Sequence, residues 1–310
     1  MVFEFYRFRF HFAARSSIHF PPGKSGNIVR GAFGSIFRKI ACAPDCRDAA
    51  ACEVHATCPY ARVFEPAGAG PSGLADWPRP FVFRAAHLDR STMRIGASFH
   101  FDVHLFDVKS PCLPYFVAAF EALAKEGIGP HRGLAELRSV EQLNLDGTVA
   151  GQLFAEPRLR APLPPIELEL RAAEASPVRR INVAFLTPTE LKGGRQLATR
   201  PDFPILFGRL RDRLSTLRAL YGEGPLEVDF RAQGERAARV RLVRWDWRRD
   251  EAERTSTRTH QTHSIGGFLG EAEYEGDLAE FAPYLEAARW IGVGRQTVWG
   301  KGEVRVSVSG

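Results

Sequence analysis

The sequence predicts an α+β protein made of two tandem ferredoxin-like domains. Three observations lead to this prediction: each half repeats the same order of expected strands and helices, a proline-rich segment separates the halves, and a glycine-rich run lies near the C-terminus. The length of 310 residues suits two domains. With 45% hydrophobic and 25% charged residues, the composition is that of an ordinary globular protein.

The elements of the first half follow from hydrophobic periodicity. Residues 99–105 alternate apolar and polar side chains, which makes the strand around them the clearest of the half. Pro111 and Pro114 mark the start of the helix that follows, and Gly127 marks its end. In order, we expect a strand at 2–13, a helix at 25–40, strands at 81–87 and 98–108, a helix at 113–126 and a strand at 137–145.

A linker is expected at 156–177, where five prolines disfavour regular structure, although residues 166–170 could still form a short strand. Both halves then show the order strand-helix-strand-strand-helix-strand of a ferredoxin-like fold. The predicted domains are 1–160, with an inserted cysteine-rich loop at 41–66, and 161–310. The second half is expected to hold a strand at 180–186, a helix at 204–221, strands at 238–247 and 263–274, a helix at 278–291 and a strand at 303–308.

The run from Gly292 to Gly302, of the form G-x-G-x5-G-x-G, is the most informative motif. Dinucleotide and P-loop fingerprints need glycines between a strand and a following helix, whereas here a helix is expected before the run and a strand after it. Glycines let the backbone approach a ligand closely, and N–H groups beside cations suit a phosphate chain. The alternative is a plain connector. The residues expected to bind phosphate are Gly292, Gly294, Arg295, Gly300, Lys301 and Gly302.

Positive charge is concentrated in one part of the chain. The formal net charge is +6, but residues 179–260 alone hold 17 Arg and 1 Lys against 11 acidic residues, a net +7. Arginine binds phosphate through its planar fork and stacks on bases; the alternative is a solvated face. No apolar run approaches the length of a membrane span, and the N-terminus lacks a signal-peptide core, so we expect a cytoplasmic protein.

Four of the five cysteines fall within 17 residues. Without a secretory signal, such clustering indicates metal rather than disulfides. We expect structural zinc that orders the loop; an iron–sulfur cluster is the less favoured alternative, and free thiols or transient disulfides are the other. The fifth, Cys112, is expected to be a small buried side chain. The expected ligands are Cys42, Cys46, Cys52 and Cys58.

Five motifs in this order resemble the CRISPR precursor-RNA processing endoribonucleases of the RAMP superfamily, over nearly the whole chain. They are VRGAFG at 29–34, CPYARVFE at 58–65, FLTPTELK at 185–192, GGFLG at 266–270 and the glycine run at 292–302. The resemblance implies RAMP-type, RRM-like domains that bind CRISPR repeat RNA and cut within each repeat. It also implies cleavage without metal, by attack of the 2′-hydroxyl to give 2′,3′-cyclic phosphate and 5′-hydroxyl ends.

That reaction needs a base, an acid and cations that hold the developing charge. Many members of the resembled family carry a histidine just after the first helix, a lysine a few residues later and a tyrosine on the helix. The resemblance therefore implies His55 for proton transfer, with Arg62 near the expected cation. The helix tyrosine has no counterpart, so Tyr60 is expected to replace it, and Lys39 is another cation nearby. Arginine can neutralise charge but cannot act as an acid at neutral pH.

Other assignments stay open at this point. His55 could instead be a metal ligand or a loop residue without a role, and its rivals are His19 and the pair His260 and His263. On a strand, two residues three apart face opposite sides, so that pair is not expected to share a metal. Outside the glycine run, the expected RNA contacts are Arg180 and Lys192, and Trp299 is expected to stack on a base or to fill the core between the domains.

Two further functions remain as alternatives. One is a non-catalytic RAMP subunit that binds CRISPR RNA in an effector complex, which the missing helix tyrosine favours. The other is a metal-stabilised protein-interaction module, which explains neither the glycine run nor the arginine excess. The expected partners are CRISPR repeat RNA and other CRISPR-associated subunits, without a membrane.

Overall fold

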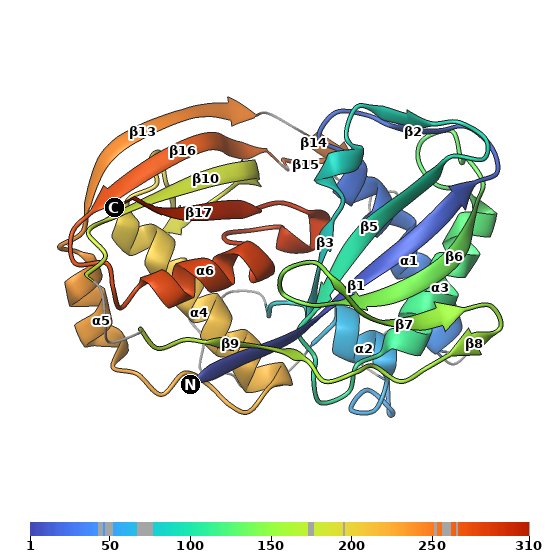
Figure 1. Cartoon of the computed structure of the whole chain (residues 1–310), viewed down its shortest axis with the longest axis horizontal. Coiled ribbons are helices and arrows are strands. Elements are labelled where there is room, and N and C mark those ends of the chain that lie inside the picture. The colour runs from blue at the N-terminus through green and yellow to red at the C-terminus, as the bar shows by residue number, and fades with distance from the viewer. Residues whose placement is uncertain are drawn as a thin grey trace.

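The computed structural model describes residues 1–42, 46, 52–66, 77–172, 177–194, 196–250, 253–255, 262–264 and 266–309. Figure 1 shows two halves side by side, with helices packed beside the sheet in each half. Among the described residues, the helices are all too short or too polar to cross a membrane.

The N-terminal half is an antiparallel sheet with the strand order β3-β5-β1-β6-β7-β8. Its two long helices, α1 (Ser25–Ala41) and α3 (Leu113–Glu126), pack against each other beside this sheet (Figure 1). The strands are β1 (Val2–Ala14), β3 (Phe81–Arg84), β5 (Ser98–Leu105), β6 (Ala135–Leu143), β7 (Val149–Ala155) and β8 (Arg158–Leu159).

The C-terminal half is a four-stranded antiparallel sheet with the order β13-β16-β10-β17. Its strands are β10 (Arg180–Thr189), β13 (Arg241–Asp250), β16 (Gly267–Glu275) and β17 (Val304–Ser309), and its helices are α4 (Phe203–Tyr221), α5 (Phe230–Ala237) and α6 (Ala282–Ile291).

Both halves share one topology. If the four main strands of each half are numbered along the chain, their order across the sheet is second, third, first, fourth. This is the order of a ferredoxin-like fold, in which the first and third strands lie at the centre and a helix follows each of them. The predicted fold class is therefore confirmed.

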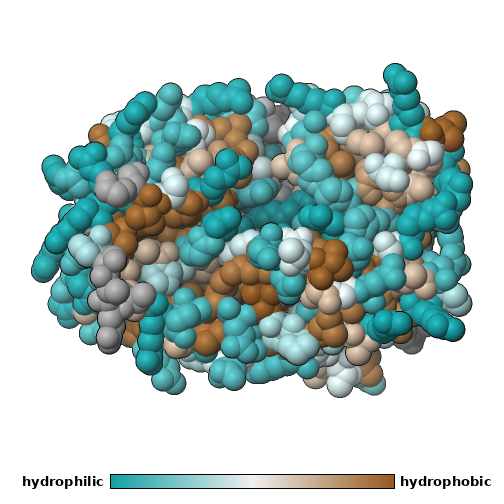
Figure 2. Space-filling view, in the orientation of Figure 1, coloured by the Kyte–Doolittle hydropathy of each residue, from teal (hydrophilic) through white to brown (hydrophobic). Residues whose placement is uncertain are grey.

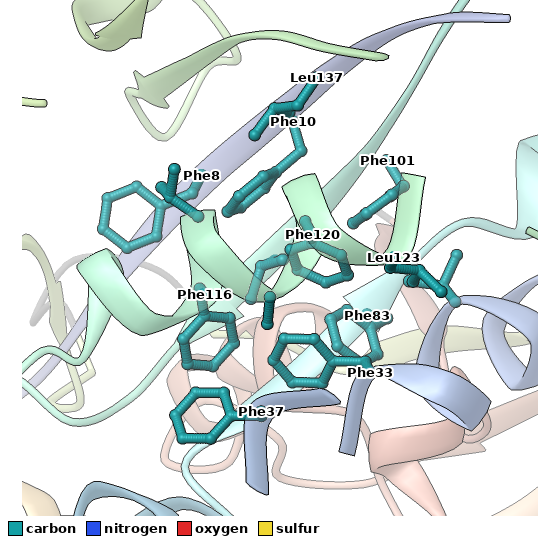
Figure 3. Packing of buried hydrophobic residues seen from close by; sticks show 14 of the residues in the cluster. Phe8, Phe10, Phe33, Phe37, Phe83, Phe101, Phe116, Phe120, Leu123 and Leu137 are labelled. Carbon is teal, nitrogen blue, oxygen red and sulfur yellow. The ribbon is translucent and has the colours of Figure 1, made fainter. Parts of the chain in front are cut away.

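The N-terminal core consists mainly of phenylalanine, and the first strand shows why. In β1 the phenylalanines Phe8, Phe10 and Phe12 alternate with polar residues, so they all point to one face, and each is at most 1% exposed. Figure 3 shows this face meeting α1 and α3, where the rings of Phe33 and Phe120 stack 4.5 Å apart. Burying each ring contributes about 1.5–3 kcal/mol to stability.

The first strand belongs to both cores. Phe3 and Phe5 are buried in the core of the C-terminal half. The start of β1 also pairs with β9 (Ile166–Glu169), a short strand that lies after the predicted domain boundary at residue 160. The N-terminal strand therefore ties the two halves together.

The structure contains short elements that periodicity did not reveal. The expected strand at 238–247 begins only at Arg241, because α5 occupies the preceding residues to Ala237. The expected strand at 263–274 is divided into β15 (Thr262–Ser264) and β16. Further short elements are β2 (Ile18–Phe20), α2 (Pro59–Phe64), η1 (Ala86–Leu88), β4 (Ser91–Met93), β11 (Lys192–Gly193), β12 (Gln196–Leu197), β14 (Glu253–Thr255) and η2 (Thr297–Trp299).

Candidate nucleic-acid interface

The glycine-rich loop after α6 can be formed only with glycine at its key positions. Gly292, Gly294, Gly300 and Gly302 have φ angles of 73°, 81°, 77° and 68°, a region that other residues rarely adopt. A Cβ atom on Gly302 would lie 2.0 Å from the carbonyl oxygen of Val293. The motif therefore specifies a tightly folded loop.

Backbone N–H groups of this loop bond within the protein. The amide of Val293 donates to the carbonyl of Gly302 (2.9 Å), and the amide of Gly302 donates to that of Pro188 (3.1 Å). The amide of Arg295 donates to the carbonyl of Glu190 (3.0 Å). These three amides are therefore not exposed donors for phosphate, contrary to expectation. They hold the loop to itself, to β10 and to Glu190 just after β10.

The side chains of the loop join the two halves. Lys301 is only 3% exposed; its ammonium group donates to the carbonyl of Gly23 (3.4 Å), and burial lowers its pKa. The ring of Trp299 lies against the guanidinium of Arg30 on α1 (4.7 Å), partly buried at the N-terminal core. Lys301 is therefore not presented to a phosphate in solvent, and Trp299 fills the space between the halves.

The other cations expected to contact RNA already have partners or are partly buried. Arg295 is half exposed and forms an ion pair with Glu190. Arg180 pairs with two glutamates of β16, at 3.3 and 3.1 Å. Lys192 is half-buried on β11. Arg180 and Arg295 are therefore paired with acidic side chains in this structure.

A cleft between the two halves does gather positive charge, and sequence reasoning missed it. It has a volume of about 300 Å³, and Figure 2 shows hydrophilic side chains in the hollow between the halves. Five arginines and three histidines face two acidic residues. The lining residues are Arg7, Arg9, Arg84, His87, His100, Asp102, His104, Leu186, Arg289, Trp290, Glu303, Val304 and Arg305.

Two neighbouring strands supply much of this lining through their alternation. In β1 the polar residues Arg7, Arg9 and His11 alternate with buried aromatic residues, and they pair across to His104, Asp102 and His100 of β5. Arg9 forms two hydrogen bonds to Asp102, of 2.7 and 3.0 Å. The polar half of the YRFRFHF pattern at residues 6–12 was the signal that could have predicted this surface.

Buried donors fasten the C-terminal end of α6 to the rest of the protein. The last carbonyls of a helix have no partner within it. Arg84 donates to the carbonyls of residues 289 and 290, at 3.0 and 3.2 Å. His104 donates to the carbonyl of Trp290 (2.9 Å), and Arg213 donates to the carbonyl of Ile291 (3.2 Å). Burial, aided by nearby Arg84, lowers the pKa of His104 to about 3 and that of Arg213 to about 9. His104 therefore acts as a neutral donor at physiological pH.

Two family comparisons identify the chain. Residues 3–164 match the AF_1859_N family, described as an N-terminal domain. Residues 183–304 match the family described as CRISPR-associated endoribonuclease Cas6. Residues 183–304 thus form a CRISPR-associated endoribonuclease Cas6 domain, and the N-terminal half belongs to the AF_1859_N family. The protein is an enzyme that processes CRISPR precursor RNA.

Solved Cas6 structures share the fold of the whole chain. A Cas6 product complex is 18% identical, with a TM-score of 0.57 over 98% of this chain and 100% of the other. A second Cas6 product complex is 19% identical, with a TM-score of 0.54 over 99% and 100%. Thermus thermophilus Cas6 is 15% identical, with a TM-score of 0.53 over 98% of each chain. No curated protein sequence matches this chain.

The three residues proposed for catalysis in this Cas6 protein have different surroundings. Tyr60 and Arg62 lie two apart on α2, so they project from opposite sides of the helix. Arg62 forms a bidentate pair with the buried Asp107, which raises the pKa of Arg62. Tyr60 is 8% exposed and lies under the guanidinium of Arg38 (5.7 Å), and burial raises its pKa. His55 is half-buried in the turn before α2.

This arrangement gives Arg62 and Tyr60 structural partners and leaves His55 as the candidate for proton transfer. Among the rivals, His19 lies on β2 and bonds to the hydroxyl of Thr92 (3.0 Å). His260 and the side chain of His263 lie outside the described residues. Lys39 is near Glu126 at the end of α3, at 3.9 Å.

The four clustered cysteines are free thiols near one another in this Cas6 protein. Burial raises the pKa of Cys42 to about 11, and the neighbouring thiols of Cys58 and Cys46 add to the effect. Within the described part of the chain, no group of three or more His, Cys, Asp or Glu side chains is arranged to hold a metal ion. Zinc at this cluster stays a prediction from the sequence.

We expect purified protein to contain about one zinc per chain, because four thiolates satisfy the tetrahedral preference of zinc. Mass-spectrometric elemental analysis checks this, and removal of the metal with a chelator is expected to lower the unfolding temperature. A variant with Cys42 and Cys58 replaced by serine is expected to lose the metal, and Cys112→Ser, outside the cluster, to keep it. Protein free of zinc and iron would contradict the prediction.

Proposed function

We propose that this Cas6-family enzyme binds CRISPR repeat RNA along the cleft between its halves and cuts it without a metal ion. In the proposed reaction the 2′-hydroxyl attacks the adjacent phosphate and leaves 2′,3′-cyclic phosphate and 5′-hydroxyl ends. The observation that carries the proposal is the cleft itself, where five arginines outnumber two acidic residues. Such a lining attracts a phosphate backbone and repels a divalent cation.

The chemistry of these residue types fits the proposed reaction. Histidine can take the proton of the 2′-hydroxyl and return one to the leaving oxygen, because its ordinary pKa of about 6.5 lies near working pH. Arginine remains charged and stabilises the phosphorane. His55 is the proton-transfer candidate, and the arginines of the cleft are the candidates for holding the backbone.

Similar solved structures support the choice of ligand and partners. Two are described as Cas6 product complexes and one as a Cas6 complex with a substrate mimic. Another is described as a partial Cas6-RT-Cas1–Cas2 complex, and this chain covers 46% of the chain that it matches there. We therefore propose repeat RNA as the substrate and other CRISPR-associated proteins as partners.

Cleavage assays with a panel of labelled CRISPR repeat RNAs in EDTA test this proposal. We expect the all-ribose strand to be cut and a strand with one 2′-deoxy substitution at the cut site to stay intact. The 3′ end of the upstream product should resist phosphatase until acid opens the cyclic phosphate. Cutting of the 2′-deoxy strand would contradict the mechanism, and binding without cleavage of either strand would establish the non-catalytic subunit instead.

His55→Ala tests the proton-transfer role within the same assay. We expect a loss of cleavage of about 10²–10⁴-fold, the range for a general acid or base, with RNA binding unchanged. His131→Ala, an exposed residue of the loop after α3, is the matched control and should cut at the normal rate. Full activity of His55→Ala would remove His55 from the mechanism.

A further inference from the structure

A pair of stacked histidines lies in the cleft between the halves and is not used by the proposed cleavage reaction. The rings of His87 and His100 are 4.7 Å apart and nearly parallel, at 27°. The Nε2 of His87 donates to the carbonyl of His100 (2.9 Å), which holds the pair in place. A third ring, that of His11, lies 5.8 Å from His100.

The same cleft holds a buried guanidinium with unused donors. The side chain of Arg84 is 9% exposed, and its Nε and Nη1 have no hydrogen-bond partner among the described residues. The nearest carboxylate oxygen, on Glu303, is 4.0 Å from Nη1, which is too far for a hydrogen bond. The Nε of the buried Arg7 is also without a partner in this part of the chain. A buried charged group without hydrogen-bond partners lowers the stability of the protein. An anion in the cleft would supply the missing acceptors.

The surroundings of His100 favour its neutral state when the cleft is empty of anions. Burial lowers the pKa of His100 below the ordinary 6.5, and Arg9 and His87 lower it further. Asp102 acts in the opposite direction but is engaged by Arg9. The charged and titratable groups around the pair are Arg7, Arg9 and His11 on β1, Arg84 on β3, Asp102 and His104 on β5, Arg289 on α6, Glu303 just before β17 and Arg305 on β17.

An anion would reverse this balance. A phosphate beside His100 stabilises the imidazolium, so the protonated form becomes favourable in the complex. Two stacked rings repel each other when both are charged, so the pair accepts one proton rather than two. The volume of about 300 Å³ is at the lower end for ligand sites, which suits one phosphodiester with its neighbouring sugar.

We propose that this cleft is a phosphate site for single-stranded RNA, where Arg84 and Arg7 hold a phosphodiester and the His87–His100 pair takes up one proton on binding. The inference rests on the proposed function in one respect, that the ligand is RNA. No covalent step is involved: the proton comes from solvent and returns to it when the RNA leaves.

The direction of the pH dependence follows from the proton balance. Because the complex binds one proton more than the separate molecules, affinity is highest at acidic pH. It then falls as pH rises, by at most about tenfold per pH unit. The fall occurs between the lowered pKa of His100 in the free protein and its raised pKa in the complex. For the wild type we expect the dissociation constant to rise by roughly 30- to 100-fold from about pH 5.5 to about pH 7.5 at constant salt.

Calorimetry with a 2′-deoxy repeat RNA, which the enzyme cannot cut, measures this proton directly. Titrations in two buffers of different ionisation enthalpy should show uptake close to one proton per chain at about pH 6.5. His100→Asn is expected to lose the uptake and most of the pH dependence while still binding RNA at high pH. His131→Asn, which lies away from the cleft, should behave as the wild type.

Competitors separate the sources of phosphate. A short RNA without terminal phosphate should compete with the same pH dependence, whereas inorganic phosphate at equal concentration should not. If only inorganic phosphate or a 5′-phosphorylated end competes, the assignment to the backbone is overturned. If His100→Asn does not fold, NMR titration of His100 in the unaltered protein replaces it, and a titration curve unmoved by RNA overturns the proposal.

The two proposals fail in different ways. If the protein binds and cuts RNA but takes up no proton, the proposed phosphate site is refuted and the proposed enzymatic function stands. If no RNA is retained at any pH, the proposed function fails, and this inference fails with it.

Discussion

Replacing Gly302 by alanine is expected to destabilise the protein by about 3 kcal/mol and to weaken RNA binding more than tenfold. The φ angle of Gly302 is 68°, and an added Cβ atom would lie 2.0 Å from the carbonyl oxygen of Val293. A contact this short cannot be relieved by a side-chain rotation, because the obstacle is backbone. The loop must therefore open.

Opening the loop affects both stability and function. It breaks the bonds from Val293 to Gly302 and from Gly302 to Pro188, which hold the loop against itself and β10. Both ends of the loop also border the cleft, since Trp290 precedes it and Glu303 follows it. A shift of the loop consequently displaces Arg289 and Arg305, and the phosphate site loses two of its five arginines.

Urea unfolding and gel-shift titrations with 2′-deoxy repeat RNA measure the two effects. Gly31→Ala is the matched control, because Gly31 lies exposed in α1 and an added Cβ atom meets nothing within 4 Å. There alanine is expected to stabilise the helix by about 0.5–1 kcal/mol and to leave RNA binding unchanged. Wild-type stability of Gly302→Ala would contradict the strain that the structure shows.

Periodicity could predict the elements whose burial is decided by residues close to them in the sequence. The alternating phenylalanines of β1 predicted a strand with one buried face, and the four glycines predicted an unusual backbone path between a helix and a strand. Both features are present. The repeated element order then fixed the ferredoxin-like topology of each half, because few sheet arrangements satisfy it.

The cleft could not be predicted in the same way, because its residues come from both halves. Arg9 and Arg305 are distant in the sequence and line one cavity only after the halves dock. Lys301 shows the opposite case. Its place in a basic, glycine-rich run favoured contact with phosphate, but docking of the loop onto the start of α1 buries it.

The segment around Tyr60 and Arg62 depended on local structure that the sequence did not reveal. As part of an extended loop, both side chains could have faced one phosphate. In the structure they lie on the short helix α2, whose geometry turns residues two apart to opposite sides. The phenol of Tyr60 and the guanidinium of Arg62 therefore leave the helix on different sides.

Removing Arg62 alone is expected to destabilise the protein by about 3 kcal/mol. The side chain of Asp107 is 2% exposed and accepts both bonds of the Arg62 fork. Arg62→Ala leaves this carboxylate buried with the amide of Ser110 (3.0 Å) as a remaining donor. A buried charge without its partner is much more costly than the loss of the pair as a whole.

Two controls isolate the effect in urea unfolding. Arg15→Ala breaks an exposed pair with Glu136, with side chains 54% and 31% exposed, and is expected to cost less than about 1 kcal/mol. The double variant Arg62→Met with Asp107→Leu replaces the buried pair by apolar groups of similar size. It should recover most of the stability that the single variant loses. An equal loss in the single and double variants would show that the pair itself, rather than the unpaired carboxylate, determines the cost.

The double variant also decides between two roles for Arg62, because it separates folding from chemistry. Since Arg62 is held by Asp107 on the side of α2 away from Tyr60, we expect it to position the helix and not to touch the reacting phosphate. The double variant should then bind repeat RNA normally and cut it within about threefold of the wild-type rate. A well-folded double variant that binds RNA but does not cut it would show instead that Arg62 leaves Asp107 and stabilises the transition state.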